Sequence, residues 1–381
     1  MSNKICVLPN DSLYDYFRKG EIKYGYFNPC NFFDEIHVIS LFDDEIDDDS
    51  VKELAGNATI KIHKIGKVNL SNYKRFYDEI FHLINKINPS LIRAYNPLIQ
   101  GWLATKIAKK LEIPVIISVH TNYDEQRKLL KKQKKIIKFF KLQFTAKKIE
   151  KYVLEEADAV ICVYQHIVPY VKKMGANNIH VIYNKVNFEH FSPEIEKKIK
   201  NNKPTIISVG RLIDQKNQMY LLEAIKNINA NLLLIGDGPN FNILNEFIQE
   251  NHIKDKVNII RSIPNKELGG YYTSCDIYAQ VLENLEGVPI PVLEAMACGL
   301  PVVMSNHDTS YSEIIDDAVI FSKNSGVDFA EAFKKLLSNP KLREQMKKKS
   351  LEVINNINGE KMERKELELY HSLIKTRKER I

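Results

Sequence analysis

Two glutamates, Glu286 and Glu294, flank a short apolar segment that reads Gly-Val-Pro-Ile-Pro-Val-Leu. Pro291 suits the first turn of a helix, where its missing N–H would have no intrahelical partner. The free N–H groups at such a helix start form an anion site beside Gly287. A glutamate on an otherwise apolar helix is costly unless it is hydrogen-bonded. Glu294 therefore either binds a vicinal pair of sugar hydroxyls or caps a neighbouring backbone N–H.

A second polar group, Ser208–Asn217, follows a strand-like run and precedes a helical pattern over Gln218–Ile228. Gly210 permits a tight turn at the carboxyl end of that strand, where open α/β sheets bind ligands. Arg211 and Lys216 can clamp a diphosphate there, Arg211 through its planar fork and Lys216 as a point charge. Diphosphate binding and a plain solvated surface both stay open as interpretations, because isolated cations in a loop are usually surface residues.

These residues need a scaffold, and short apolar runs alternating with helical patterns indicate one. Runs rich in Ile and Val between helices are typical of βαβ units on parallel sheets. The predicted strands are Lys4–Leu8, Ile36–Leu41, Ser90–Ala94, Pro114–His120, Ala159–Val163, His180–Ile182, Thr205–Val209, Asn231–Ile235, Val257–Ile260, Ile277–Gln280, Pro301–Met304 and Ala318–Phe321. We expect two Rossmann-like domains, 1–190 and 191–360, joined through the polar segment 187–203. A C-terminal helix, 361–381, either packs on the first domain or caps the second.

Length and composition agree with two ordinary globular domains. The chain has 381 residues, of which 44% are hydrophobic and 27% charged. Its five cysteines are scattered and form no C-x-x-C pair, so we expect reduced thiols, a cytoplasmic location and neither a zinc site nor disulfides. The longest apolar stretch, 287–304, contains Glu294 and three prolines, which argues against a membrane span.

The net charge of +7 is concentrated in one segment. Arg127–Lys151 contains ten lysines and one arginine against one acid, Glu150. Apolar and aromatic residues interleave with these lysines at helical spacing, which favours an amphipathic helix on an anionic membrane surface. A solvated helix of the first domain is the plainer alternative. Nucleic-acid binding is disfavoured because the aromatics lie in a helical pattern rather than on a sheet.

The acidic run Asp43–Asp49 contains a D-x-D pattern of the kind that binds metal–nucleotide complexes. Adjacent carboxylates in a loop repel one another and lack a rigid frame, so we interpret the run as a solvated loop. We therefore predict no metal site.

Several motifs together resemble the retaining GT-B glycosyltransferases of the GT4 family. They are Gly210-Arg211-x4-Lys216, Gly236-Asp-Gly-Pro239 and Glu286-Gly-x6-Glu294-Ala-x-Ala-x-Gly-x-Pro-Val-Val303, supported by Asn184-Lys-Val-Asn187 and Glu156-Ala-Asp158. The resemblance runs from about Lys4 to Leu351 and implies a GT-B fold, an α/β architecture of two Rossmann-like domains that face each other across a cleft.

The resemblance also implies site residues. Arg211 and Lys216 would hold the donor diphosphate, Glu294 the ribose hydroxyls and Glu286 the transferred sugar. The remaining implied donor contacts are His120 at a strand end, Ile263 beside the base, and the backbone from Gly287 through Val288 to Val292. Relatives often have a Gly-Gly loop after the first strand, and here Gly20 is the candidate in its place.

The implied reaction moves a sugar from a UDP- or GDP-type donor to a hydroxyl of a lipid-linked or cell-envelope glycan, without a metal or other cofactor. The expected location is the cytoplasm, at the inner face of the membrane, with segment 127–151 on the anionic surface and no nucleic-acid partner. A nucleotide-sugar epimerase or phosphorylase on the same fold is the alternative. The nucleotide, the sugar, the acceptor and the oligomeric state are not specified by the sequence.

Overall fold

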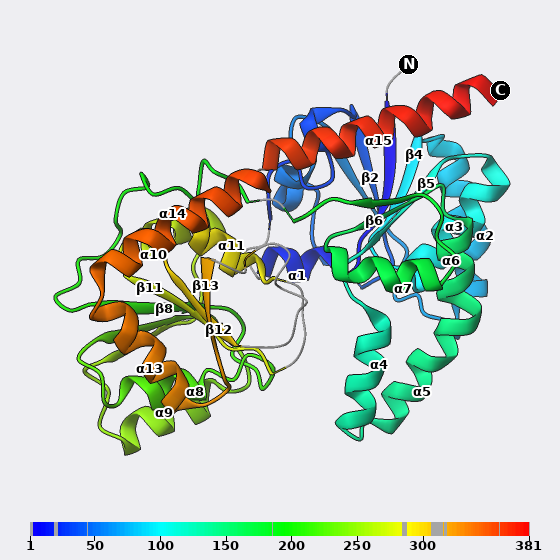
Figure 1. Cartoon of the computed structure of the whole chain (residues 1–381). Helices are drawn as coiled ribbons and strands as arrows, with labels where there is room; N and C mark the ends of the chain where they lie inside the picture. The colour runs from blue at the N-terminus through cyan, green and yellow to red at the C-terminus, as the bar shows by residue number, and fades with distance from the viewer. Residues whose placement is uncertain are drawn as a thin grey trace. The chain divides into compact units, whose positions relative to one another are not determined.

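The computed structural model describes residues 3–18, 22–43, 45–184, 186–283, 288–305, 315, 318–357 and 359–380. The chain divides into two compact units (Figure 1). Unit 1 contains residues 1–183 together with 360–381, and unit 2 contains residues 184–359.

Unit 1 is built on a parallel sheet of seven strands in the order β3-β2-β1-β4-β5-β6-β7. Its strands are β1 (Lys4–Leu8), β2 (Glu35–Ser40), β3 (Thr59–Lys64), β4 (Leu91–Ala94), β5 (Val115–Val119), β6 (Ala159–Cys162) and β7 (Ile179–Val181). Its main helices include α1 (Leu13–Arg18), α2 (Tyr73–Ile87), α3 (Ile99–Leu111), α6 (Lys151–Glu156) and α7 (Val168–Lys173). The strand order reverses direction between β1 and β4, which makes their carboxyl ends the topological switch point of this sheet.

The edge strand β3 is the one strand of the described residues that the sequence pattern missed. Ile60 is buried between the exposed residues Thr59 and Lys61, and the rest of the strand is half-buried or exposed. The short apolar runs of the central strands are absent here, because an edge strand buries one face only. The alternation Thr-Ile-Lys-Ile-His-Lys was the available signal.

Unit 2 has a parallel sheet of six strands in the order β10-β9-β8-β11-β12-β13. They are β8 (Thr205–Val209), β9 (Asn231–Ile235), β10 (Val257–Ile260), β11 (Ile277–Gln280), β12 (Val302–Ser305) and β13 (Val319–Ser322). The helices include α8 (Met219–Ile225), α9 (Phe241–Glu250), α10 (Leu268–Thr273), α11 (Ile290–Ala297), α13 (Gly326–Leu337) and α14 (Pro340–Asn356). The switch point lies between β8 and β11. All twelve predicted strands are present, displaced by at most about one residue.

The polar segment 187–203, which we expected to join two domains, packs on unit 2. The N–H of Lys198 donates to the carbonyl of Gly270 at 2.9 Å, and that of Ile199 donates to Ser274 Oγ at 3.1 Å. Gly269 lies so close that an added Cβ would be 2.0 Å from the His190 carbonyl oxygen. The division after residue 183, rather than 190, follows from these contacts.

The C-terminal helix α15 (Gly359–Arg380) packs on unit 1 (Figure 1). Arg93, a buried residue of β4, forms an ion pair with Glu366 of this helix. Its guanidinium also contacts the Tyr370 hydroxyl at 2.5 Å and lies over the Tyr95 ring. Tyr370 is fully buried in the core of unit 1. A buried cation of the sheet and apolar packing by Met362 and Leu369 thus both hold the helix on unit 1.

The basic segment 127–151 is broken at residues 133–135 and is not the single amphipathic helix that we predicted. α4 (Tyr123–Lys132) ends in a Schellman motif, where Lys134 adopts φ of 55° and the Lys135 N–H donates to the Leu130 carbonyl at 2.9 Å. α5 (Ile136–Thr145) follows after three residues and packs against α4. Figure 1 shows this helical hairpin extending away from the sheet of unit 1.

Arg127 belongs to the interior of this hairpin and not to its basic surface. It is 5% exposed and pairs with the fully buried Glu150. Thr145 Oγ1 and the Tyr170 hydroxyl donate to the same carboxylate, each at 2.6 Å. Counting Arg127 among the surface cations was therefore wrong, because its charge is compensated at the base of the hairpin.

Candidate active site

The loops after β8 and β9 approach each other closely at the carboxyl edge of the unit 2 sheet. A Cβ on Gly236 would lie 2.0 Å from the Gly210 carbonyl oxygen, and one on Gly238 would lie 2.3 Å from that of Leu212. A Cβ on Gly210 itself would meet nothing within 4 Å. Both Gly236 and Gly238 therefore exclude side chains so that the two loops can stack, whereas the surface above Gly210 is open.

Arg211 and Lys216 lie in the loop between β8 and α8, as the sequence predicted. Arg211 is exposed, and its carbonyl accepts a hydrogen bond from Gln218 Nε2 at 3.0 Å. Lys216 is half-buried, and its N–H donates to the Ile213 carbonyl at 2.9 Å. The loop is thus folded on itself, and it carries two cations at the switch point.

Glu294 lies on α11 and is 2% exposed. Its Oε1 accepts from Asn265 Nδ2 at 3.0 Å, and its Oε2 accepts from the Tyr272 hydroxyl at 3.2 Å. Burial, followed by the negative charge of Glu294, raises the pKa of Tyr272 and of Tyr278. Two side chains, Asn265 and Tyr272, thus hold this carboxylate.

Ile263 is half-buried in the loop after β10, two residues before Asn265. The loop that we expect beside a base therefore also supplies the amide that contacts Glu294. Neither Asn265 nor Tyr272 was identified from the sequence. The available signal was weak: a polar residue just after Pro264 at a strand's carboxyl end.

The start of α11 presents fewer open N–H groups than we predicted. Val288 and Val292 are both buried, and the Val292 N–H donates to the Pro289 carbonyl at 3.0 Å. Val292 thus closes the first helical turn with its own amide. Three predicted site residues, Gly20, Glu286 and Gly287, lie outside the described residues.

His120 follows β5 in unit 1 and is held in a polar, aromatic setting. Its ring stacks on Tyr95 with centroids 6.0 Å apart. Its Nε2 is buried and has no hydrogen-bond partner among the described residues. Burial, assisted by the charge of Arg93, lowers the pKa of His120 to about 4. The imidazole is therefore neutral at pH 7 and offers a nitrogen for a hydrogen bond.

Carboxylates of the run 43–49 serve as local acceptors. Asp43 accepts from the Lys67 N–H, Asp47 from that of Ser50 and Asp48 from that of Ile62. Over the part of the chain that the structure describes, no group of three or more His, Cys, Asp or Glu side chains is placed to hold a metal ion. The same residues include no helix with the length and apolarity that a membrane crossing needs.

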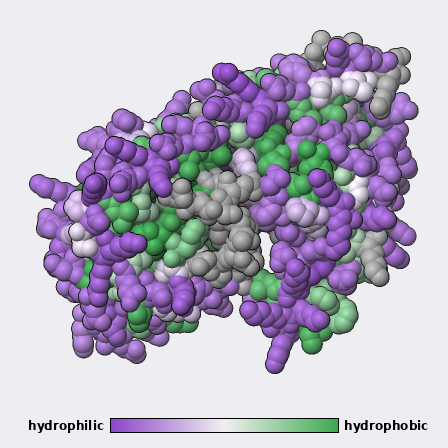
Figure 2. Space-filling view, viewed as in Figure 1, coloured by the Kyte–Doolittle hydropathy of each residue, from purple (hydrophilic) through white to green (hydrophobic). Residues whose placement is uncertain are grey.

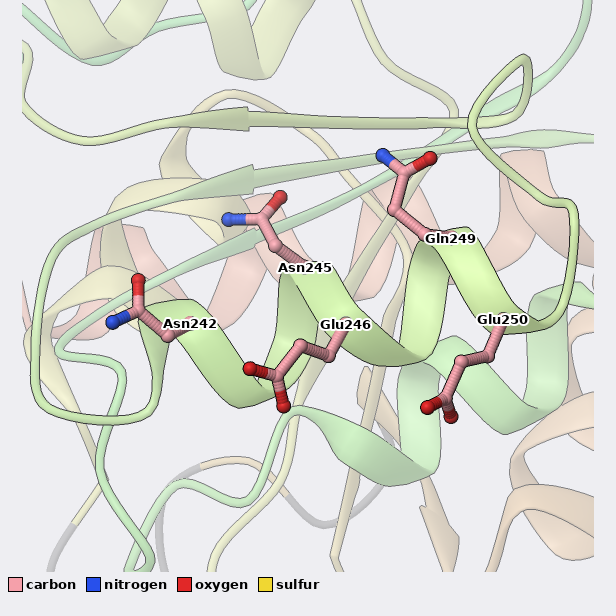
Figure 3. Close-up of a pocket in the computed structure, with 5 residues that line it drawn as sticks. All are labelled: Asn242, Asn245, Glu246, Gln249 and Glu250. Atoms are coloured by element: carbon pink, nitrogen blue, oxygen red, sulfur yellow. The ribbon is translucent and has the colours of Figure 1, made fainter.

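A shallow depression along α9 lies apart from these groups. Figure 3 shows its lining on one face of that helix: Asn242, Asn245, Glu246, Gln249 and Glu250. None of these residues follows the carboxyl end of a strand directly, and none belongs to the loops described above. We therefore place the candidate site at the carboxyl edge of the sheet and not in this depression.

Two family models match the chain in succession. One, described as Glycosyltransferase Family 4, matches residues 34–190, and the other, described as Glycosyl transferases group 1, matches residues 192–353. An uncharacterized glycosyltransferase of Methanocaldococcus jannaschii is 26% identical over 282 residues, which are 74% of this chain and 74% of that protein.

A named relative and a solved structure extend the comparison. UDP-Gal:alpha-D-GlcNAc-diphosphoundecaprenol alpha-1,3-galactosyltransferase of Escherichia coli is 26% identical over 318 residues, 77% of this chain and 78% of that enzyme. Sucrose-phosphate synthase from Thermosynechococcus elongatus superposes with a TM-score of 0.76 at 18% identity, covering 98% of this chain and 100% of that one. The structural likeness establishes a shared fold.

Proposed function

Because this chain belongs to the GT4-type GT-B glycosyltransferases, we propose that it transfers a sugar from a UDP- or GDP-type nucleoside diphosphate sugar to an acceptor hydroxyl with retention at the anomeric carbon. The setting of Glu294 carries the proposal. This buried carboxylate is held by Asn265 and Tyr272 at the sheet edge that also carries Arg211 and Lys216.

The donor fits the loops of unit 2 by its chemistry. A carboxylate offers two acceptor oxygens, which match the vicinal hydroxyls of a ribose. Arg211 and Lys216, in the loop after β8, which is the neighbour of β11, supply two cations for the diphosphate. In our proposal Ile263, in the loop that supports Glu294, contacts the base of the nucleotide.

Bond cleavage builds negative charge on the departing diphosphate and positive charge on the sugar ring. In our proposal Arg211 and Lys216 stabilise the leaving group, so the reaction needs no metal. One preorganised donor of this kind is typically worth about 3–4 kcal/mol. Glu286 contacts the transferred sugar, and His120, which is neutral at pH 7, contributes a hydrogen bond to it. The departing phosphate oxygen takes the acceptor proton.

We propose a lipid-linked or cell-envelope glycan as the acceptor, used at the inner face of the membrane. The named Escherichia coli relative acts on a diphosphoundecaprenol-linked sugar. The hairpin of unit 1 leaves Ile136, Ile137, Phe140 and Phe144 between 59% and 75% exposed, and Figure 2 shows a hydrophobic patch over α5. Large apolar side chains amid lysines are suited to an anionic lipid surface.

A nucleotide-release screen tests the reaction. Purified protein is incubated with UDP-, GDP- and ADP-sugars, with and without lipid extract, and products are identified by mass. We expect release of one nucleotide that depends on the extract, with a matching glycolipid product, and Lys216→Ala lowers this release by orders of magnitude. Donor consumption without acceptor would instead indicate an epimerase, and no release with any donor would contradict the proposal.

Vesicle co-sedimentation tests the membrane contact independently. The full chain should sediment with vesicles of phosphatidylcholine and phosphatidylglycerol at low salt, and not with phosphatidylcholine alone. Phe140→Ser with Ile137→Ser should reduce binding, whereas Ile243→Ser, at an apolar position of α9 that is 55% exposed, should not. Failure of wild-type protein to bind the anionic vesicles would reject the membrane contact and leave the transfer reaction standing.

A further inference from the structure

Glu283 is a half-buried carboxylate at the switch point of unit 2 that the reaction described above does not use. It lies three residues after β11, whose neighbour in the sheet is β8. Its N–H donates to the Gln215 carbonyl at 2.9 Å, and its Oε1 accepts from Asn217 Nδ2 at 2.6 Å. These two contacts hold the residues immediately before and after Lys216.

The second carboxylate oxygen of Glu283 connects this residue to the region after β13, at the far edge strand of the same sheet. Glu283 Oε2 accepts from Asn324 Nδ2 at 3.3 Å, and this amide also donates to the Leu282 carbonyl at 2.9 Å. Asn324 Oδ1 in turn accepts from Ser305 Oγ at 2.5 Å. Ser305 ends β12 and Asn324 follows β13, so Glu283 and Asn324 together connect the carboxyl ends of four adjacent strands.

The Lys216 loop requires such support because its backbone is unusual. Asn217 has a backbone φ of 24°, a conformation that residues other than glycine rarely adopt. The Asn217 side chain is the group that reaches Glu283. The charge of Glu283 also acts on its surroundings, since it adds to burial in raising the pKa of Tyr220 on α8.

We propose that Glu283 is a positioning residue that fixes the Lys216 loop for the donor diphosphate. The inference rests on the proposed donor-binding role of Lys216. A lysine is a point charge on a long flexible stem, so its usefulness to a phosphate depends on where the backbone places it. Small displacements of such groups lower rates strongly even when the displaced residue is remote from the reacting atoms.

A double-mutant cycle tests the proposal. Binding of UDP, GDP and ADP to the full-length protein is measured by calorimetry for wild type, Glu283→Ala, Asn217→Ala and the double variant. We expect each single variant to bind its diphosphate about tenfold more weakly, as for a lost hydrogen bond to a charged group. The double variant should be no weaker than Glu283→Ala, because both changes remove the same contact. Binding of the corresponding monophosphate should change less.

Asp276 supplies a matched control at the opposite end of β8 and β11. Its N–H donates to the Thr205 carbonyl at 2.9 Å and its carboxylate accepts from the Thr205 N–H at 2.8 Å, so it bridges the same two strands. Asp276→Ala should lower thermal stability at least as much as Glu283→Ala without the loss of diphosphate affinity.

The outcomes separate this inference from the proposed function. The positioning role alone is overturned if Glu283→Ala binds the diphosphate as tightly as wild type does. It is also overturned if Asp276→Ala loses as much diphosphate affinity as Glu283→Ala does, at matched folded fraction. Additive effects of Asn217→Ala and Glu283→Ala overturn it as well. If wild-type protein binds none of the three diphosphates, the donor site itself is wrong and the inference falls with it.

Discussion

Glu150 in unit 1 and Glu294 in unit 2 are the same residue type at nearly the same burial, yet their surroundings differ. Glu150 is fully buried at the base of the hairpin, where it pairs with the Arg127 guanidinium and accepts from Thr145 and Tyr170. Glu294 is 2% exposed, and it accepts from an amide of Asn265 and from a phenol of Tyr272.

We interpret Glu150 as a carboxylate that holds structure and Glu294 as one that contacts a ligand, because of where each lies in its unit. A buried charge is costly unless it is paired, and Arg127 supplies the pairing for Glu150 from 23 residues earlier in the chain. Glu294 lies on an otherwise apolar helix at the sheet edge where ligands of α/β folds bind. We therefore expect loss of Glu150 contacts to reduce stability, and loss of Glu294 contacts to reduce donor use.

The largest expected effect is on the Arg127–Glu150 pair. Arg127→Met leaves Glu150 buried without its cation, and breaking such a pair typically costs about 3–5 kcal/mol. Urea unfolding should show this loss, and Arg127→Met combined with Glu150→Gln should recover part of it because the stranded charge is removed. If Arg127→Met alone were as stable as wild type, Glu150 would not need its cation.

Glu294→Gln is expected to act on activity instead. The amide keeps the shape of the side chain but loses one acceptor oxygen and the charge, and hydrogen bonds to charged groups are worth about 1.5–3 kcal/mol. We expect kcat/KM for the donor to fall by about 10- to 100-fold while the urea midpoint shifts little. A destabilisation as large as that of Arg127→Met, with normal turnover of the folded fraction, would reverse the assignment.

His120 extends the comparison to a buried base. Its folded pKa is about 4, against about 6.5 for an unfolded histidine, so the unfolded chain binds the proton first as pH falls. The stability that neutral His120 contributes is fully present above pH 6.5 and is lost between pH 6.5 and about 4, by an amount on the order of 3 kcal/mol. Unfolding free energies measured over this range should show a shallower slope for His120→Asn than for wild type.

Sequence periodicity identified the scaffold because central strands of a parallel sheet are continuous apolar runs. The edge strand β3 escaped because lysine and histidine occupy its exposed face. The candidate cations and Glu294 were found through their local motifs. Their supporting residues were not, since Asn265 lies 29 residues from Glu294 and Asn217 lies 66 residues from Glu283. Only the folded sheet edge brings such pairs together.

Arg127 is a residue whose role was predicted wrongly because its partner lies far away in the sequence. Counted by sequence, it belonged to a basic surface, but its partner Glu150 lies 23 residues later in the chain, beyond the end of α5. Charge patterning along a chain reports surface potential only for residues that stay exposed. The lysines of α4 and α5 meet that condition better than Arg127, because most of their positions are exposed.

Two tyrosines offer the smallest and most closely matched test. Tyr170 and Tyr272 are both buried, and each hydroxyl donates to its glutamate, at 2.6 and 3.2 Å. Burial and the adjacent carboxylate raise the pKa of both phenols, so each remains a proton donor throughout the neutral range.

Replacement of either tyrosine by Phe removes one hydrogen bond worth about 1 kcal/mol and leaves the ring packing intact. Tyr170→Phe should lower the free energy of unfolding with donor KM unchanged. Tyr272→Phe should raise donor KM several-fold, because an acceptor oxygen of Glu294 is then less well oriented. Equal effects of the two substitutions on KM would show that the partners of a buried carboxylate do not distinguish a structural from a functional one in this fold.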